Sequence, residues 1–418
     1  MNNTFLLKSV SLVLLGLFFH GTFGQTLSQK QLLDSSKALF KYERTLRGEE
    51  HKAFDYRPII SLLDRFLKND SNNPEALYHL GYAYSRLNSK SAVGLNDMNV
   101  DLVIKSSQLF EKVIALSPKY TGETVILDPY GKLTAEWGSM ALHYLMNEKP
   151  DSALWAFKQG RKRGGFSDFL LELSRKSLDA CSKNAILMAF GDLQTFPFWY
   201  LQKVENYRTD VSVINSDLLS TETYSSYVLE QKIADFDWPS NAINGYYIPW
   251  VDSSITIGDL TWDVKSQFKG GYISISNKIL LSILQKNQFQ RDVFFTLGFD
   301  KSSMVSLQKR VGSLISILKL YPTGKSTLSH EDYLKKMKEV LILSKHVNLN
   351  SGDDIGNYDY LRYDVFERIQ KALKTKNKKE AKALFEQLDT YGSKEKIPYW
   401  SKSYEEYDQT LRNYLYGQ

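Results

Sequence analysis

The sequence predicts a mixed α+β and α/β protein, in which a TPR-like helical array, a small α/β domain and a set of C-terminal helices follow one another. Three observations predict this order. Residues 25–181 carry apolar residues at helical spacing, with helix-pair patterns. Residues 182–321 contain short apolar runs separated by turns, as strands do. Residues 322–418 return to helical spacing, so we place domain boundaries between these ranges.

Residues 1–24 have the pattern of a secretory signal peptide. Lys8 precedes the apolar run Val10–Phe19, which is too short to span a bilayer. Thr22-Phe23-Gly24 then supplies a small-residue cleavage site before Gln25. No later stretch is long and apolar enough to cross a membrane. We therefore expect a mature chain without a transmembrane segment, exported across the inner membrane and soluble in the periplasm.

The composition excludes some function classes. The chain has 418 residues, with 53 Lys and Arg against 47 Asp and Glu. Its two short basic clusters lack interleaved aromatic residues, and together with the export signal this argues against a nucleic-acid partner. The one cysteine, Cys181, cannot form an internal disulfide, and its helical surroundings predict a buried thiol.

The clearest repeat signal lies at Asn73–Tyr84, which resembles the first helix of a tetratricopeptide repeat (TPR). Such a helix packs closely against its partner at a glycine, here Gly81, and Phe110 has the expected spacing on the second helix. A weaker unit contains Trp137-Gly138 and Phe157. The apolar stripes bury each helix against its neighbour. The concave face of such a stack also commonly binds partner proteins, so both interpretations stay open.

A βαβ unit follows the array. Asn184–Phe190 is a nearly continuous apolar run, typical of a strand buried on both faces. Gly191-Asp192 ends it, Thr195 offers a helix-capping hydroxyl, and Pro197 suits a first helical turn. Val211–Ile214 predicts a second strand, which should lie parallel to the first.

The rest of the α/β region contains shorter signals. We expect a helix over Ser216–Phe236, β-like runs that form a hairpin or flap, a helix capped by Ser276, and a buried strand over Asp292–Leu297. Ser302–Lys309 predicts a short helix, and Val311–Leu320 fits either a strand or a helix.

The C-terminal region should be helical from Ser329 to the end. Ala381–Leu388 resembles the second helix of another repeat, and Tyr399–Tyr416 predicts an amphipathic last helix. Leu349–Asp359 contains three acidic residues, but their spacing fails the pattern of a calcium-binding loop. We expect it to be a solvated loop.

The sequence contains little that indicates chemistry. Its six His are dispersed, and none of the zinc-protease, Walker or nucleophile-elbow motifs occurs. We therefore predict no catalytic residue, metal or cofactor. One candidate site remains at Asp192, at the carboxyl end of the first strand, where open parallel sheets place their ligands. Asp192, Thr195 and the following backbone amides could hold an anion or a hydroxyl-rich group. Alternatively, the two side chains only satisfy the helix terminus.

The stretch from Asn184 to Leu219 resembles the extracytoplasmic tail of a bacterial integral-membrane family related to protein O-mannosyltransferases. That tail combines an α/β part with TPR-like helices. The matching residues are Gly191, Asp192, Thr195, Phe196, Pro197, Trp199, Tyr200, Gln202, Arg208, Asp210, Val211, Asn215, Leu218 and Leu219. A looser match covers Asn277–Leu297. Leu193 and Gln194 depart from the family, where Asn and Asp are usual.

The membrane helices that carry sugar transfer in such enzymes are absent here. The resemblance therefore implies a stand-alone tail without transferase activity, working beside a glycosylation system or reused for another purpose.

Two functional hypotheses follow. The first is a non-catalytic periplasmic scaffold that binds envelope proteins through its helical repeat surface. The alternative is a glycan-binding or glycosylation-accessory protein that uses the loop Gly191–Gln202, with Asp192 accepting hydrogen bonds from sugar hydroxyls and Trp199 or Tyr200 stacking on a ring. Burial of both rings, with Asp192 capping the helix, would weigh against the alternative. The candidate binding residues are Gly191, Asp192, Thr195, Trp199, Tyr200, Gln202 and Arg208.

Overall fold

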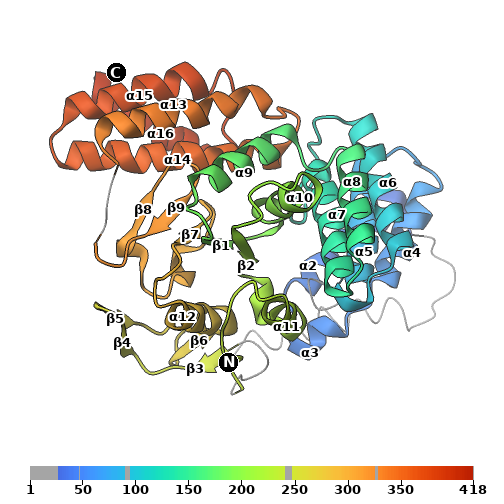
Figure 1. Cartoon of the computed structure of the whole chain (residues 1–418). Helices are drawn as coiled ribbons and strands as arrows, with labels where there is room; N and C mark the ends of the chain where they lie inside the picture. The colour runs from blue at the N-terminus through green and yellow to red at the C-terminus, as the bar shows by residue number, and fades with distance from the viewer. Residues whose placement is uncertain (1–26, 47, 90–94, 241–246, 325–327, 418) are drawn as a thin grey trace.

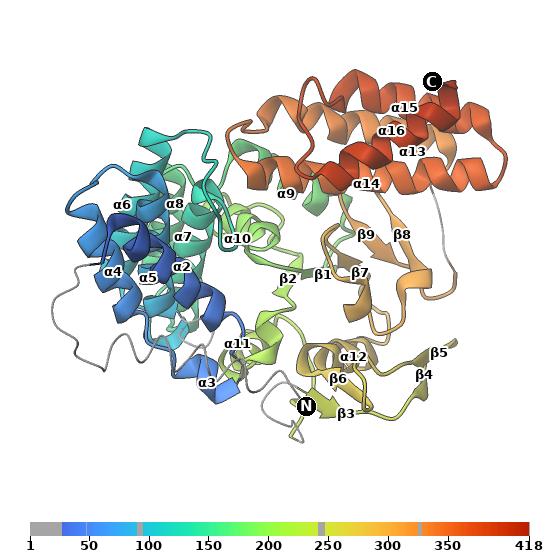
Figure 2. The same ribbon diagram turned by 180° about the vertical axis from the view of Figure 1, so that it is seen from behind.

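The computed structural model describes residues 27–46, 48–89, 95–240, 247–324 and 328–417. The predicted signal peptide lies outside these ranges. Figures 1 and 2 show a central sheet with the N-terminal helical array on one side and the C-terminal helices packed across its end. The mixed architecture predicted from the sequence is therefore confirmed.

The array consists of packed helix pairs. Helices α5 and α6 form one pair, and α7 and α8 form the next. Its helices are α2 (Gln29–Glu43), α3 (Gly48–Lys52), α4 (Arg57–Leu67), α5 (Pro74–Ser89), α6 (Val100–Leu116), α7 (Pro129–Met146) and α8 (Pro150–Lys162), with the short turn η1 (Leu95–Asp97) between α5 and α6.

Two glycines of the array allow close packing, one within the array and one against the α/β region. A Cβ atom at Gly81 of α5 would lie 3.0 Å from the Phe110 ring of α6, so the predicted approach at this glycine is confirmed. At Gly138 of α7, a Cβ atom would lie 2.2 Å from the Phe196 ring. Phe196 begins the helix that connects the first two strands, so this second contact fixes the array against the α/β region.

The predicted βαβ unit is confirmed. After α9 (Asp168–Ala180), strand β1 (Ile186–Ala189) leads through η2 (Asp192–Gln194) and α10 (Phe196–Val204) to β2 (Ser212–Asn215). Ile186 pairs with Ser212 in the parallel register. Pro197 lies in the first turn of α10, as expected.

The main sheet has five strands in the order β2-β1-β7-β9-β8. Strand β7 (Val293–Phe295) lies parallel to β1 on the side opposite β2. Strands β8 (Val311–Ser313) and β9 (Leu318–Leu320) add an antiparallel edge, so the ambiguous run Val311–Leu320 forms strands. Since β1 lies between its parallel neighbours β2 and β7, the strand order reverses there, and such sheets open a crevice at the carboxyl ends of the strands around that point.

Smaller elements lie between β2 and β7 in the chain. After η3 (Leu218–Ser220) comes α11 (Glu222–Glu230), so only part of the predicted helix over 216–236 forms. Strand β3 (Tyr247–Pro249) pairs with β6 (Tyr272–Ser274). The expected hairpin is formed by β4 (Ser253–Ile257) and β5 (Leu260–Val264), and α12 (Ile275–Asn287) follows β6.

Two local predictions in this region are wrong. Residues 302–309 do not form one helix, because they contain the end of η4 (Lys301–Ser303) and the start of η5 (Gln308–Arg310). Helix α12 is capped by Ser274 rather than Ser276, since the Ser274 hydroxyl accepts a hydrogen bond from the Asn277 amide. The Ser276 side chain instead faces a pocket.

The C-terminal region is helical as predicted. Its elements are α13 (His330–Leu341), η6 (Ile342–His346), α14 (Gly352–Lys374), α15 (Lys378–Gly392) and α16 (Lys402–Tyr416). The expectation of a solvated loop over 349–359 is wrong, because α14 begins at Gly352 and buries Asp354 and Asp359 at 2% and 0% exposure. Asp354 accepts hydrogen bonds from Ser167 and from the Asn348 amide.

The apolar core crosses the sequence boundaries of the three regions. Trp137 of α7 and Phe157 of α8 belong to the same buried cluster as the strands of the main sheet. Helix α9 contributes Phe169 to a second cluster with the C-terminal helices. Cys181 is buried, and loss of solvent raises the pKa of its thiol to about 12. The domain boundaries proposed from the sequence stay a prediction.

Candidate functional site

The carboxyl edge of the parallel strands carries three acidic side chains. Asp192 follows β1, Asp217 follows β2 and Asp300 lies five residues beyond β7. Because β1 lies between β2 and β7, its carboxyl end is the position where an open α/β sheet provides a crevice. Two hollows open at this edge, and Asp217 lines both.

A hydrogen-bond network joins the loops that follow β1 and β2. The buried Asn215 amide donates to the Thr195 hydroxyl over 3.0 Å, and that hydroxyl donates to the Gly191 carbonyl over 2.8 Å. The Gly191 amide donates to Asp217 over 3.0 Å. Gly191 has a φ of +74° and a ψ of 165°, a conformation that is strained for any residue with a Cβ. The network thus fixes the positions of Asp192 and Asp217.

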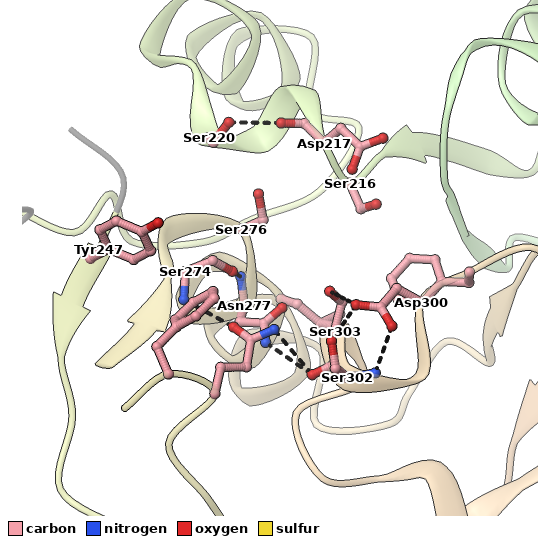
Figure 3. A pocket seen from close by; sticks show the side chains of 14 residues that line it. Ser216, Asp217, Ser220, Tyr247, Ser274, Ser276, Asn277, Asp300, Ser302 and Ser303 are labelled. Atoms are coloured by element: carbon pink, nitrogen blue, oxygen red, sulfur yellow. Dashed lines mark hydrogen bonds between the residues drawn. The ribbon is translucent and has the colours of Figure 1, made fainter. Parts of the chain in front are cut away.

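The first hollow, which we call the serine pocket, has a volume of about 400 Å³. Figure 3 shows side chains from the loop after β2 facing those of α12 and the η4 turn across it. Most of its lining residues carry hydroxyl, amide or carboxylate groups, and apolar and aromatic side chains complete the lining. The lining residues are Ser216, Asp217, Ser220, Tyr247, Gln267, Phe268, Ser274, Ser276, Asn277, Leu280, Phe299, Asp300, Ser302 and Ser303.

One hydroxyl of this pocket has no hydrogen-bond partner within the described part of the chain. Ser216 is only 5% exposed, yet its hydroxyl makes no hydrogen bond there. A buried hydroxyl without a partner is costly, so a native structure rarely keeps one without a reason. A ligand that donates to or accepts from Ser216 would remove this cost.

Two aromatic rings stand at the mouth of the pocket. Tyr247 and Phe268 are 42% and 41% exposed, and their ring centroids lie 5.0 Å apart in an edge-on arrangement. They offer the flat apolar surface on which a sugar ring can stack. The sequence prediction sought this role in Trp199 and Tyr200, on another segment.

The charge of the serine pocket is negative. None of the described residues that line it is Lys, Arg or His. Desolvation is the largest single influence on the pKa of Asp300 and would raise it, but hydrogen bonds from the Ser302 hydroxyl and amide and from Ser303 together lower that pKa. Desolvation raises the pKa of Asp217, the hydrogen bond from Gly191 opposes this, and the charge of Asp300 adds to the rise.

The second hollow, which we call the interface cavity, lies between the array and the α/β region and has a volume of about 370 Å³. Arg86 of α5 and Lys132 and Glu136 of α7 line it from the array side. Asp192 and Asp217 line it from the sheet edge. The inner face of α5 and α7 therefore faces the chain's own α/β loops across this cavity.

The predicted capping of α10 is wrong. Thr195 lies at the N-cap, but its hydroxyl donates to the Gly191 carbonyl and accepts no bond from the helix amides. The Asp192 carboxylate makes no hydrogen bond to the residues that the structure describes, and Asp192 lines the interface cavity. Burial raises the pKa of Asp192 to about 6; the Lys132 charge opposes the shift, and the charges of Asp217 and Glu136 add to it.

The other predicted site residues lie inside the fold. Trp199 and Tyr200 are 6% and 8% exposed, and the Trp199 indole donates to the Val213 carbonyl over 3.3 Å. Gln202 donates to the carbonyls of Arg208 and Val211. Arg208 donates to backbone carbonyls at the end of α9 and pairs with Asp210. The structure therefore brings Gly191, Asp192 and Thr195 to the sheet edge, while the remaining four stabilise the βαβ unit.

Sequence reasoning missed most of the serine pocket. Its residues come from separate segments near 216, 247, 267, 276 and 302, and none forms a spaced motif. One signal was available: Ser216-Asp217 follows the second predicted strand, just as Gly191-Asp192 follows the first. The carboxyl ends of neighbouring parallel strands meet at one edge, so both pairs belonged to one candidate site.

Comparison with known families identifies one region. Residues 171–237 match the family described as TMEM260-associated domain 2. The match runs from within α9 through β1, α10 and β2 and past the end of α11, so it includes the network that positions Asp192 and Asp217. No curated protein matches the chain. Of the helices in the described ranges, none combines the length and apolar character that a membrane span requires.

Proposed function

We propose that this chain is a glycan-binding protein whose ligand lies in the serine pocket, and that it acts as an accessory to glycosylation without chemistry of its own. The observation that carries the proposal is the buried Ser216 hydroxyl, which lines a pocket rich in hydroxyl, amide and carboxylate groups and has no partner among the described residues. Sugars present many hydroxyls that both donate and accept, and such a lining can pair with them.

The chemistry of the pocket suits sugar hydroxyls in particular. The Asp217 and Asp300 carboxylates accept charge-assisted hydrogen bonds from hydroxyl donors. Asn277 is 2% exposed, and its side-chain amide donates to the Ser302 carbonyl over 3.4 Å, which holds it at the base of the pocket. The rings of Tyr247 and Phe268 provide the apolar face for a sugar ring.

The charge of the pocket restricts the sugar class. An anionic sugar, such as a uronic acid or a sugar phosphate, would meet two carboxylates and no cation among the described lining residues. Like charges at close range disfavour binding, and the pocket therefore selects neutral sugars.

The cellular setting remains part of the proposal. The resemblance to the tail of a family related to protein O-mannosyltransferases supports a role beside glycan transfer, and the resembling stretch lies within the TMEM260-associated segment 171–237. The apolar run within residues 1–24 supports export to the periplasm. In this proposal Gly191 and Thr195 fix the geometry of the loop. The hydrogen bonds to sugar hydroxyls that the sequence assigned to Asp192 are made by Asp217 and Asp300. The stacking that it assigned to Trp199 or Tyr200 is provided by Tyr247 and Phe268.

A glycan array with purified protein tests the proposal. We expect neutral glycans to bind wild type, and we expect Ser276→Leu, which fills the pocket, to abolish binding. Thr256→Leu on the exposed face of the β4–β5 hairpin is the matched control and should bind normally. Release of a sugar by the pure protein would overturn the non-catalytic part, and absence of any Ser276-dependent binding would overturn the glycan part.

A second candidate function is the envelope scaffold, and one observation favours it. Trp155 of α8 is 41% exposed, with its ring centroid 5.5 Å from that of the buried Trp137. An exposed tryptophan whose position is fixed by a buried neighbour is a common anchor of protein interfaces. A photo-crosslinker at position 155 in intact cells should capture one envelope protein reproducibly, and crosslinking only to abundant bystanders would contradict this candidate.

A further inference from the structure

The interface cavity contains more negative charge than its own cations neutralise. Arg86 and Lys132 are 6% and 7% exposed, and each already has a carboxylate partner. Arg86 contacts Glu43 at 2.8 Å, and Lys132 contacts Glu136 at 2.8 Å. Lys132 also donates to the Ser85 hydroxyl at 2.9 Å and lies over the Tyr82 ring. Each cation therefore already has a carboxylate beside it, although the Lys132 charge also acts on Asp192.

The two remaining acids of the cavity have no such partner. Within the described ranges, neither Asp192 nor Asp217 forms an ion pair, and the Asp192 carboxylate accepts no hydrogen bond. The Asp217 carboxylate accepts one bond, from the Gly191 amide. Asp192 is partly buried, and its carboxylate faces the cavity with Glu136 and Asp217 nearby. An uncompensated carboxylate away from bulk water is costly, and a bound cation would relieve that cost.

The walls of the cavity indicate what kind of cation fits. Met98 from the array side and Phe196 and Leu218 from the sheet edge are nearly buried apolar residues that line it. A group that combines an apolar stem with a terminal positive charge would contact these walls and reach the two acids. A metal ion finds less support, since the described residues contain no group of three or more acidic, His or Cys side chains suited to hold one.

We propose that the interface cavity binds the lysine side chain of a partner peptide, with the ammonium group between Asp192 and Asp217 and the alkyl stem against Phe196 and Leu218. The inner face of α5 and α7, which helical arrays commonly use for peptides, supplies the other wall. This site is separate from the serine pocket, although Asp217 borders both, and the proposal does not depend on glycan binding.

The test uses the full chain and three probes: acetyl-Gly-Lys-Gly-amide, the same peptide with an acetylated lysine side chain, and calcium chloride alone. Binding is followed by NMR shifts of the aspartate side chains and by calorimetry. We expect saturable binding of the lysine peptide only. Asp192→Asn should weaken it by at least about tenfold, as loss of a charged hydrogen-bond partner does. Phe268→Ala in the serine pocket should leave it unchanged.

The other outcomes contradict the proposal. Equal affinity of wild type and Asp192→Asn for the lysine peptide would show that the ammonium binds elsewhere. Binding of the acetylated peptide with the same affinity would show that charge plays no part. Failure of the lysine peptide to saturate wild type at millimolar concentration, or Asp192-dependent binding of calcium alone, would also overturn it. If Asp192→Asn does not fold, Asp192→Ser provides the same test.

Discussion

The backbone amide of Gly191 donates a hydrogen bond of 3.0 Å to the carboxylate of Asp217, and this contact joins the carboxyl ends of β1 and β2. It requires the unusual backbone of Gly191, with a φ of +74°. The same loop turns Asp192 toward the array, so both acids line the interface cavity, and Asp217 lines the serine pocket as well. This arrangement underlies the predictions below.

Gly191→Ala should destabilise the chain. No atom lies within 4 Å of a Cβ at this position, so the cost is conformational, about 1–3 kcal/mol in the free energy of unfolding. Gly352→Ala is the control, because it lies in the first turn of α14 with its nearest neighbour 3.7 Å from the new Cβ. Urea unfolding measures both. Equal stability of the two variants would show that the strained loop is unimportant.

Gly138→Ala should weaken the attachment of the array to the α/β region. The new methyl group would lie 2.2 Å from the Phe196 ring, and such overpacking typically costs about 1–3 kcal/mol. Gly356→Ala is a matched control in the second turn of α14, where the nearest atom is at 3.5 Å and where alanine should stabilise the helix. A higher melting temperature for Gly138→Ala than for Gly356→Ala would contradict this packing.

Ser216→Ala should leave the unfolding free energy unchanged or raise it. The Ser216 hydroxyl has no partner among the described residues, so its removal loses no hydrogen bond. Ser225→Ala provides the contrast. Ser225 is also buried, but its hydroxyl donates a hydrogen bond to the Leu219 carbonyl at 2.9 Å. The contrast variant should lose about 1 kcal/mol. A comparable loss in Ser216→Ala would indicate a structural partner for that hydroxyl.

The pH dependence of stability should change in Asp192→Asn. Burial raises the pKa of Asp192 to about 6 in the folded chain, against about 4 when unfolded, so folding takes up a proton between these values. The stability that the protonated group contributes is present below about pH 4 and lost as the pH rises through 6. The variant should therefore exceed wild type in stability most clearly above pH 6.

Asp210→Asn is the control of opposite sign. The hydrogen bond from Arg208 lowers the pKa of Asp210 to about 2, although burial opposes the shift. Its contribution is therefore present above about pH 4 and lost as the pH falls toward 2. Melting temperatures across this range, in a buffer without primary amines, should separate the two variants. A constant difference between Asp192→Asn and wild type at every pH would show that Asp192 does not titrate as described.

Local patterns in the sequence predicted the framework well. The spacing around Gly81 and Gly138 predicted helix pairs that pack closely, and the βαβ unit followed from two apolar runs and Pro197. These features depend on residues close in sequence, where periodicity and turn chemistry determine the structure. The repeat family, the signal peptide and the periplasmic location stay predictions.

The errors came from long-range contacts. Residues 349–359 have the acidic composition of a surface loop, yet Asp353 accepts a hydrogen bond from the Asp128 amide, and Asp128 accepts bonds from the Ser351 hydroxyl and the Asp353 amide. These partners lie more than 200 residues apart. The sequence predicted that Trp199 stacks on a sugar ring, but Trp199 is buried and its indole donates to Val213 of the neighbouring strand. Local sequence does not distinguish an exposed ring from a buried one.

The most direct test of the glycan proposal is isothermal titration of wild type and Ser276→Leu with a neutral oligosaccharide selected from the array, beside its uronic-acid counterpart. We expect saturable binding of the neutral sugar to wild type, with no measurable heat for Ser276→Leu or for the acidic sugar. Undiminished binding of the neutral sugar to Ser276→Leu would contradict the assignment of the serine pocket as the site.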